Sequence, residues 1–397
     1  MQITEHGWKK EHNIRKSNLV LIIVLAGFIL SVVFHIVMAK VFGYDYYPYN
    51  TFLFWPADRF NDFLNHFYRA GHLNPYQPPN TFTVYFPFTY ICVYLLTFLP
   101  AKVAFALLFG IFICSFAYYI FSNLPASNYR GKILGVFILT FLSYPILFTV
   151  DRGNLEILVF LFLLLFVNYY QKGDNVKSVI FLSLAIAMKL YPGVFVVLFC
   201  ADKKYKNIIY TGILVLALSV FSAAVLEGGV QASIQGLQHN LGLFKETYLQ
   251  SIMWLHFNTS LYGAIFILGE KFTFLTIVIK YYIVLALIAF VLTSLFIICK
   301  EKEFWRRVSL LVFMMLLLPQ LTHDYKMIHL YIAMMLFLNS QKQSPYDMLY
   351  TILFGLLLIP KDYLLLQGDI SIAVFLNPLF MLMIAGTILL DRTSMRV

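Results

Sequence analysis

Residues 19–41 read LVLIIVLAGFILSVVFHIVMAKV, and this stretch decides the class of the protein. It is long enough to cross ~30 Å of hydrocarbon as a helix, and similar apolar runs of roughly 15–25 residues recur as far as Leu390. Of 397 residues, 61% are hydrophobic and only 12% are charged, which is too little polar surface for a soluble protein. The sequence therefore predicts an all-α, polytopic integral membrane protein with about 12 transmembrane helices.

The charges flanking these runs predict the orientation of the chain in the membrane. Basic residues before the first run place residues 1–18 in the cytoplasm, and residues 391–397 form a second cytoplasmic end. Between them, 19–390 is expected to be one transmembrane domain with external loops at 43–83 and 227–258. Spans are expected at 19–41, 84–99, 101–121, 133–150, 155–170, 179–200, 207–226, 273–299, 308–322, 327–339, 346–359 and 371–390, whereas 259–270 is too short to cross.

Two topologies remain open between residues 122 and 178. Simple alternation puts 151–154 in the cytoplasm and Lys172 and Lys177 outside. A broken, re-entrant pair within 179–200, hinged at Lys189–Pro192, reverses these positions and agrees better with the preference for positive charge inside. We favour the second topology slightly.

The composition also indicates what the protein does not bind. The formal net charge of +10 comes from Lys and Arg in short loops between the spans. The preference of such loops for the cytoplasmic side explains this charge better than binding to a nucleic acid does. No P-loop, dinucleotide fingerprint or metal-ligand spacing is present, so no cofactor is expected; a divalent metal is possible, but no pattern in the sequence supports it. The expected location is the plasma (inner) membrane of a bacterium.

The first external loop contains a predicted amphipathic helix from Trp55 to Gly71. Proline near its start, an acid in its first turn and glycine at its end are typical helix boundaries. At 100° per residue, one face carries Phe60, Phe63, Leu64 and Phe67, and the other carries Asp58, Asp62, His66 and Arg69. We expect an interfacial helix with its rings on the membrane. Its acidic face is either a solvated surface or a carboxylate at headgroup depth that accepts a proton from a sugar hydroxyl.

Three further groups of polar residues occur at or near membrane depth. Lys189 lies in an otherwise apolar run and either binds a phosphate or extends to the interface. Arg152-Gly153-Asn154 forms either an anion site at a helix start or an ordinary charged turn. His323 and Asp324, in a cluster of ionisable residues, could carry protons or act as metal ligands, although their spacing fits no particular metal.

The chain resembles glycosyltransferase family 87, the polyprenol-phosphate-mannose-dependent mannosyltransferases of the GT-C superfamily. The blocks that carry the resemblance are 62–76 (DFLNHFYRAGHLNPY) with Tyr85-Phe86-Pro87, Arg152-Gly153-Asn154, 188–192 (MKLYP), 258–263 (NTSLYG) and, more loosely, 319–325. They occur in this order over most of the chain. The resemblance implies a GT-C-like helical bundle.

The same resemblance implies a function and roles for individual residues. Asp62 would be the catalytic base, with Asp58 as the alternative, and Lys189 and Arg152 would hold the donor phosphate. The expected cleft-lining residues are His66, Arg69, Asn154, Tyr191, Asn258, His323 and Asp324. The enzyme would transfer a hexose, most simply mannose, from a polyprenyl phosphate to a lipid-linked or glycan acceptor outside the cytoplasm. The alternatives are a flippase of lipid-linked sugars and a polysaccharide polymerase or ligase.

Overall fold

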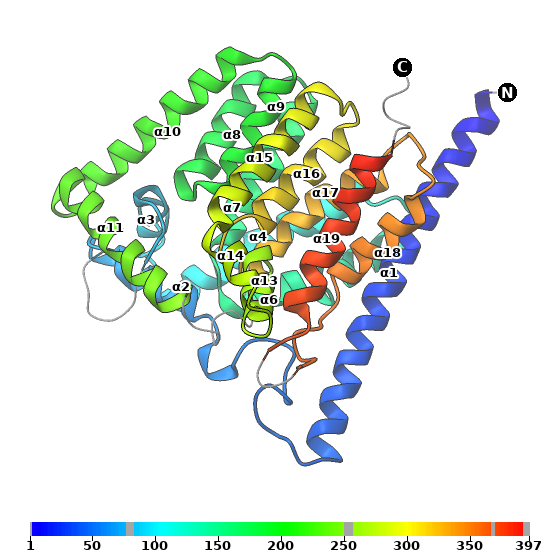
Figure 1. The fold of residues 1–397 in the computed structure, drawn as a ribbon, viewed down its shortest axis with the longest axis horizontal. Coiled ribbons are helices and arrows are strands. Elements are labelled where there is room, and N and C mark those ends of the chain that lie inside the picture. The colour runs from blue at the N-terminus through cyan, green and yellow to red at the C-terminus, as the bar shows by residue number, and fades with distance from the viewer. Residues whose placement is uncertain (1, 77–82, 250–256, 367–369, 392–397) are drawn as a thin grey trace. The chain divides into compact units, whose positions relative to one another are not determined.

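The computed structural model describes residues 2–76, 83–249, 257–366 and 370–391, with side chains from residue 10 onward. Within these ranges the chain is helical and contains no β-strand, only two isolated β-bridges (Figure 1). The expected all-α class is therefore confirmed for the described residues.

Five described helices are long and apolar enough to cross a membrane, or six if one bent pair counts as a single span. This confirms a membrane protein but not the expected count of about 12. The bent pair, α5 and α6, turns by 47° at its break. The candidates are Lys10–Lys40 within α1 (Gln2–Lys40), α4 (Ala101–Asn123), α10 (Tyr205–Val225), α15 (Tyr282–Cys299), α19 (Ala373–Leu390), and the pair α5 (Tyr129–Phe141) with α6 (Tyr144–Arg152).

The count is smaller because several expected spans contain only helices shorter than ~18 residues, which are short for crossing ~30 Å. The expected span 179–200 consists of α8 (Asn175–Met188), a 3₁₀ turn η2 (Tyr191–Phe195) and α9 (Val196–Ala201). Proline at 192 has no backbone N–H to continue α8, and Lys189 is already extended. The break expected at Lys189–Pro192 is thus present.

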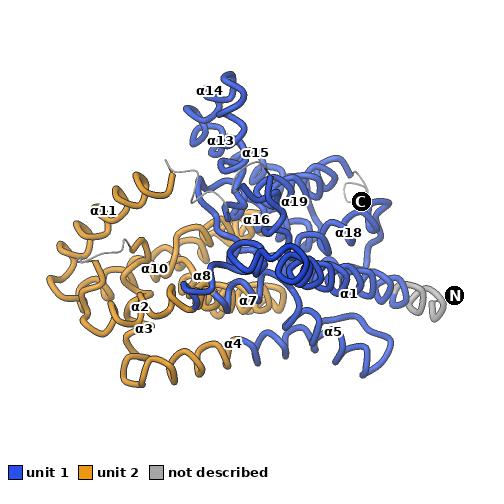
Figure 2. Tube along the Cα trace, turned by 90° about the horizontal axis from the view of Figure 1, so that it is seen from below, with its two compact units in different colours: residues 1–59, 113–151, 256–397 blue, residues 60–112, 152–255 orange. Residues whose placement is uncertain are grey.

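Contacts divide the chain into two compact units, shown in Figure 2. Unit 2 comprises residues 60–112 and 152–255. In it, α8 packs on both α7 and α10, and α3 packs on α2 and α10. Its further helices are α2 (Asn61–Gly71), α3 (Pro87–Tyr94), α7 (Glu156–Gln171) and α11 (Gly229–Tyr248). The last of these occupies much of what was expected to be the second external loop.

Unit 1 comprises residues 1–59, 113–151 and 256–397. Here α16 is buried along its whole length and packs on α17 and α19, while α1 packs along α18. Its remaining elements are η1 (Pro56–Asp58), α13 (Leu261–Gly269), α14 (Leu275–Lys280), α16 (Phe304–Leu317), η3 (Asp324–His329), α17 (Leu330–Leu338) and α18 (Asp347–Leu357).

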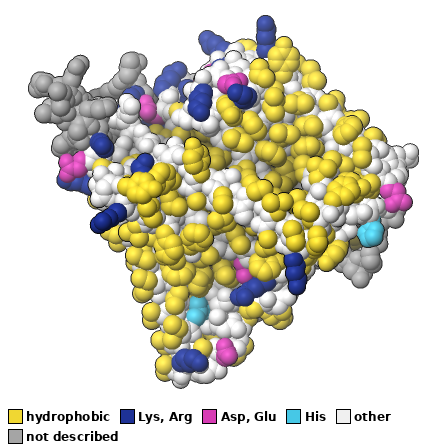
Figure 3. Space-filling model, turned by 180° about the vertical axis from the view of Figure 1, so that it is seen from behind, with side chains coloured by type: hydrophobic (Ala, Val, Ile, Leu, Met, Phe, Trp, Pro, Cys, Tyr) yellow, Lys and Arg dark blue, Asp and Glu magenta, His cyan; other side chains and the backbone are white. Residues whose placement is uncertain are grey.

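The exposed side chains agree with a lipid environment. Hydrophobic side chains cover most of the face in Figure 3, and Lys and Arg lie there in separate groups. On α10 and α15 most of the large apolar side chains are exposed, for example Leu216 and Leu292. A helix that is apolar all round and largely exposed is stable in hydrocarbon and not in water.

Candidate active site

The predicted helix of the first loop is present but broken. Backbone at Phe60 adopts a left-handed conformation (φ 59°), which separates η1 from α2. Asp62 is therefore in the first turn of α2, where the helix dipole favours a carboxylate. Asp58 lies in η1, so the prediction that both acids share one continuous helix was wrong.

The aromatic face of α2 is buried within unit 2. Phe63 and Phe67 are almost inaccessible, and the Phe63 ring lies 5.4 Å from Phe105 and 6.3 Å from Phe109, both on α4. The expectation that these rings rest on the membrane is therefore wrong for Phe63 and Phe67. The face of α2 that carries these rings packs against α4 instead. This packing sets the rotation of α2 about its axis, and with it the direction of the opposite face, which carries Asp62.

The carboxylate of Asp62 is held by two side chains distant in sequence. Arg152 donates from its guanidinium to Oδ1, and Asn154 donates from Nδ2 to Oδ2 at 2.6 Å. Between these two residues, Gly153 has a φ of 65°, and a Cβ there would lie 3.0 Å from the Cβ of Phe63. Glycine therefore lets the chain approach α2 closely. The Asp62 side chain still retains 19% exposure.

The orientation of Asn154 is fixed by two donors to its amide oxygen. Backbone N–H of Glu156 donates to Oδ1 at 2.9 Å, and the Tyr85 hydroxyl donates to it at 3.1 Å. Because the oxygen is occupied in this way, the amide nitrogen must point toward Asp62. Burial, followed by the charges of Glu156 and Asp62, raises the pKa of Tyr85 well above its usual value, so the phenol remains a donor.

Lys189 is paired with an acid in the structure. Its Nζ lies 2.7 Å from Oε2 of Glu156, which is fully buried, and 4.2 Å from the ring centroid of Tyr85. The Tyr191 hydroxyl donates to the other oxygen of Glu156. Glu156 was not among the predicted site residues, although it lies only two residues after Asn154.

His66 and Arg69 lie on the same face of α2 as Asp62. Burial, with the charges of Arg69 and Lys189, lowers the pKa of His66 to about 3, so the imidazole is neutral at physiological pH. Its Nδ1 is 3.1 Å from the Tyr90 hydroxyl. Arg69 donates to the carbonyl of Pro75 at 3.1 Å. We call Asp62, His66, Arg69, Tyr85, Arg152, Asn154, Glu156, Lys189 and Tyr191 the Asp62 cluster; it lies entirely within unit 2.

A second group of predicted residues assembles within unit 1. Asn258 and His323 form an isolated antiparallel bridge. The Asn258 side chain donates to Gln320 O at 2.9 Å and accepts from Thr322 N at 2.9 Å, so it ties the two segments together. Thr259 donates to Asp324 Oδ1 at 2.9 Å. The side-chain amide of Asn258 therefore bonds the backbone of the segment 320–322.

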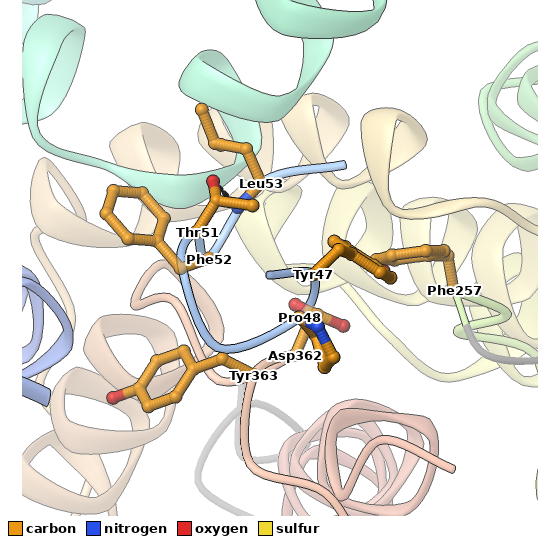
Figure 4. Close-up of a pocket in the computed structure, with 8 residues that line it drawn as sticks. All are labelled: Tyr47, Pro48, Thr51, Phe52, Leu53, Phe257, Asp362 and Tyr363. Atoms are coloured by element: carbon orange, nitrogen blue, oxygen red, sulfur yellow. Dashed lines mark hydrogen bonds between the residues drawn. The ribbon is translucent and has the colours of Figure 1, made fainter. Parts of the chain in front are cut away.

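Asp324 is a buried acid beside another acid. The Tyr144 hydroxyl donates to its Oδ2 at 3.0 Å. Burial, followed by the neighbouring Asp362, raises the pKa of Asp324 well above its usual value, and burial lowers the pKa of Lys361 to about 8. Asp362 also lines a small pocket whose other walls are largely aromatic, including Tyr47, Phe52, Phe257 and Tyr363 (Figure 4). Sequence reasoning found Asp324 and missed Asp362, which no motif marks.

The family model described as glycosyltransferase family 87 matches residues 82–319, which is more than half of the chain. The chain belongs to glycosyltransferase family 87. As a member of this family it is a membrane-embedded glycosyltransferase. No curated protein and no solved structure matches it.

The matched region of this family 87 member does not cover all of the site residues. It includes Arg152, Asn154, Lys189 and Asn258, whereas Asp62 precedes it and His323 follows it. Two residues of the matched region, Arg152 and Asn154, donate hydrogen bonds to the Asp62 carboxylate. Among the residues that the structure describes, no three His, Cys, Asp or Glu side chains converge to hold a metal ion.

Proposed function

We propose that this glycosyltransferase transfers a hexose, most simply mannose, from a polyprenyl phosphate to a lipid-linked or glycan acceptor, with Asp62 as the base. The observation that carries the proposal is the Asp62 carboxylate, oriented by Arg152 and Asn154 and still partly exposed. A general base must be held in a fixed orientation and lie within reach of the proton that it removes. The hydrogen bonds and the partial exposure of Asp62 support this role. Asp58, in η1, is the alternative.

The reaction forms one bond and breaks another at the anomeric carbon. The acceptor hydroxyl oxygen attacks this carbon, and its proton passes to Asp62. The bond from the carbon to the phosphate oxygen breaks with its electron pair, which leaves polyprenyl phosphate. Each carboxylate oxygen has two acceptor sites, so bonds from Arg152 and Asn154 leave room for the acceptor hydroxyl.

Positive charge is needed where the phosphate departs. The guanidinium of Arg152 lies against the Asp62 carboxylate and is a planar set of N–H donors of the kind that binds phosphate. The charge of Lys189 is balanced by Glu156, which reduces its attraction for a second anion. Arg69, on the same face of α2 as Asp62, adds a further cation. We therefore assign the phosphate to Arg152 first, with Arg69 and Lys189 as supporting charges.

The location of the reaction follows from the proposed orientation of the chain. A cytoplasmic, basic N-terminus would put the end of α1 and the loop that follows it on the external side of a plasma membrane. Asp62 would then act outside the cytoplasm. Lipid-linked donors serve reactions on that side because the carrier supplies activation without a soluble nucleotide.

The proposal is tested by sugar transfer in proteoliposomes that contain the purified chain. Labelled polyprenyl-phosphate mannose, glucose and arabinose are offered in parallel, with a membrane-lipid extract as acceptor and nucleotide sugars as the control. Label entering a product from a polyprenyl-phosphate donor supports the proposal. Transfer from nucleotide sugars alone, or donor crossing the bilayer without product, would contradict it, and the latter would indicate a flippase.

A further inference from the structure

The helix α11 presents three different faces. One face packs on other helices and loops of unit 2: Asn240 donates to the carbonyl of Tyr76 at 3.4 Å, and Ser233 donates to that of Ala223 at 3.3 Å. At Gly236 the approach is so close that a Cβ would lie 2.6 Å from the Cβ of Tyr76. Small and polar residues thus fix how α11 is rotated about its axis.

The second face is an exposed apolar stripe. Val230, Ile234 and Leu241 fall within about 40° of one another at 100° per residue. Their side chains are 36%, 51% and 47% exposed. The third face is exposed and polar, and Gln235 and His239 lie on it. An apolar stripe left uncovered beside a polar one is typical of a helix lying at a membrane surface.

The apolar stripe begins where the lipid-facing surface of α10 ends. Leu216, Phe221 and Val225 of α10 are exposed along this candidate span. Figure 1 shows α11 turning back from the end of α10, and Gly229 begins it only a few residues after Val225. The exposed apolar residues of α11 therefore follow, along the chain, the exposed apolar residues of a candidate membrane span. The basic residues at the other end of α10, Lys203 to Lys206, indicate that α11 is at the external end.

We propose that α11 lies in the headgroup layer of the external leaflet and inserts its Val230–Ile234–Leu241 stripe into phospholipid. The partner of the stripe is the bilayer itself. The helix α11 carries only one Lys and one Glu, so it has no net charge from these residues to attract anionic lipid. Insertion therefore depends on apolar contact and not on anionic lipid.

This placement has a consequence for the Asp62 cluster. Tyr76, on which α11 rests, donates from its hydroxyl to the carbonyl of Tyr85 at 2.9 Å, and Tyr85 in turn bonds Asn154. An α11 helix bound to lipid is thus connected, through Tyr76 and Tyr85, to Asn154, which orients Asp62. The helix fixes the cluster near headgroup depth.

The test compares two labelled positions in the full-length chain. With the native cysteines replaced, Leu241→Cys on the stripe and Gln235→Cys on the polar face each receive an NBD fluorophore; both sites are exposed, so folding is preserved. The proteins are placed in phosphatidylcholine nanodiscs with and without lipids that carry a doxyl quencher.

We expect blue-shifted emission and strong doxyl quenching at 241, water-like emission and weak quenching at 235, and no change at high salt. Equal, water-like emission at both positions would overturn the proposal. So would emission at 241 that is blue-shifted yet not quenched by doxyl lipid, because the stripe would then be covered by protein, such as a second copy of the chain. Release of the stripe by salt would also overturn it.

Discussion

Replacing Lys189 tests whether this lysine is a structural partner or a ligand for the donor. The change Lys189→Met keeps the length and apolar stem of the side chain but removes its charge. In the structure Nζ is 2.7 Å from a carboxylate oxygen of Glu156, whose side chain is fully buried, and the lysine side chain is only 13% exposed. The substitution would leave a buried carboxylate without its cation.

The expected magnitude follows from the burial of the pair. Removing one partner of a buried ion pair costs about 3–5 kcal/mol. Because Tyr191 still donates to Glu156 after the change, we expect about 3 kcal/mol, the lower end of that range. In the double variant Glu156→Gln/Lys189→Met no charge is stranded, so a coupling energy of about 1–3 kcal/mol is expected.

The assay is the free energy of unfolding in mixed micelles, from a titration with sodium dodecyl sulfate followed by tryptophan fluorescence. Wild type, the two single variants and the double variant complete the cycle. Additive costs, with no coupling, would refute the pairing. Lys189 would then be available to the donor phosphate, and Lys189→Met should weaken donor binding without destabilising the fold.

Three further predictions concern unit 2. Because the folded state keeps His66 neutral down to about pH 3 while the unfolded state takes up a proton below about pH 6.5, stability is lost as pH falls. Between pH 7 and pH 5 wild type should lose about 2 kcal/mol more than His66→Gln in its free energy of unfolding, and equal pH slopes would argue against a buried imidazole. Asn154→Leu removes a hydrogen bond to the Asp62 carboxylate worth about 1.5–3 kcal/mol and should slow transfer about 10- to 150-fold, measured as kcat on the proposed donor; an unchanged kcat would show that Asn154 does not position Asp62. Gly236→Leu overpacks the contact with Tyr76 and should destabilise the fold by about 1–3 kcal/mol in the same titration, whereas a neutral effect would mean that α11 does not rest there.

The class of fold was predictable from the sequence, but the number of spans was not. Runs such as 19–41 are apolar over their whole length and form single helices, as α1 does. The stretch 179–200 is also mostly apolar, yet the proline at 192 and the extended Lys189 end the helix after Met188. Hydropathy measures preference for lipid and does not report where the backbone breaks inside it.

The candidate site was partly predictable. Asp62 was predicted on the polar face of an amphipathic helix, Arg152 and Asn154 in a polar block at a helix start, and Lys189 in an apolar run. The structure brings all four into unit 2. Their pairing was not predictable, because Asp62 and Arg152 are 90 residues apart and no local pattern links them. Glu156 was not predicted as a partner of Lys189, because the two residues are 33 positions apart and no local pattern links them.

The three-faced helix α11 shows a different limit. Its stretch, 229–248, has low charge and many glutamines, which resembles a polar loop when only hydropathy is considered. The apolar stripe becomes visible only when the residues are placed on a helix whose rotation is known. Contacts of Gly236 and Asn240 with Tyr76 supply that rotation.

The most direct test of the catalytic assignment compares Asp62→Asn with Asp58→Asn in the proteoliposome transfer assay, with folding checked by the unfolding titration. Loss of a positioned base should slow transfer by about 10²- to 10⁴-fold in Asp62→Asn, and Asp58→Asn should remain close to wild type. An active Asp62→Asn variant together with an inactive but folded Asp58→Asn variant would contradict the account and move the base to η1.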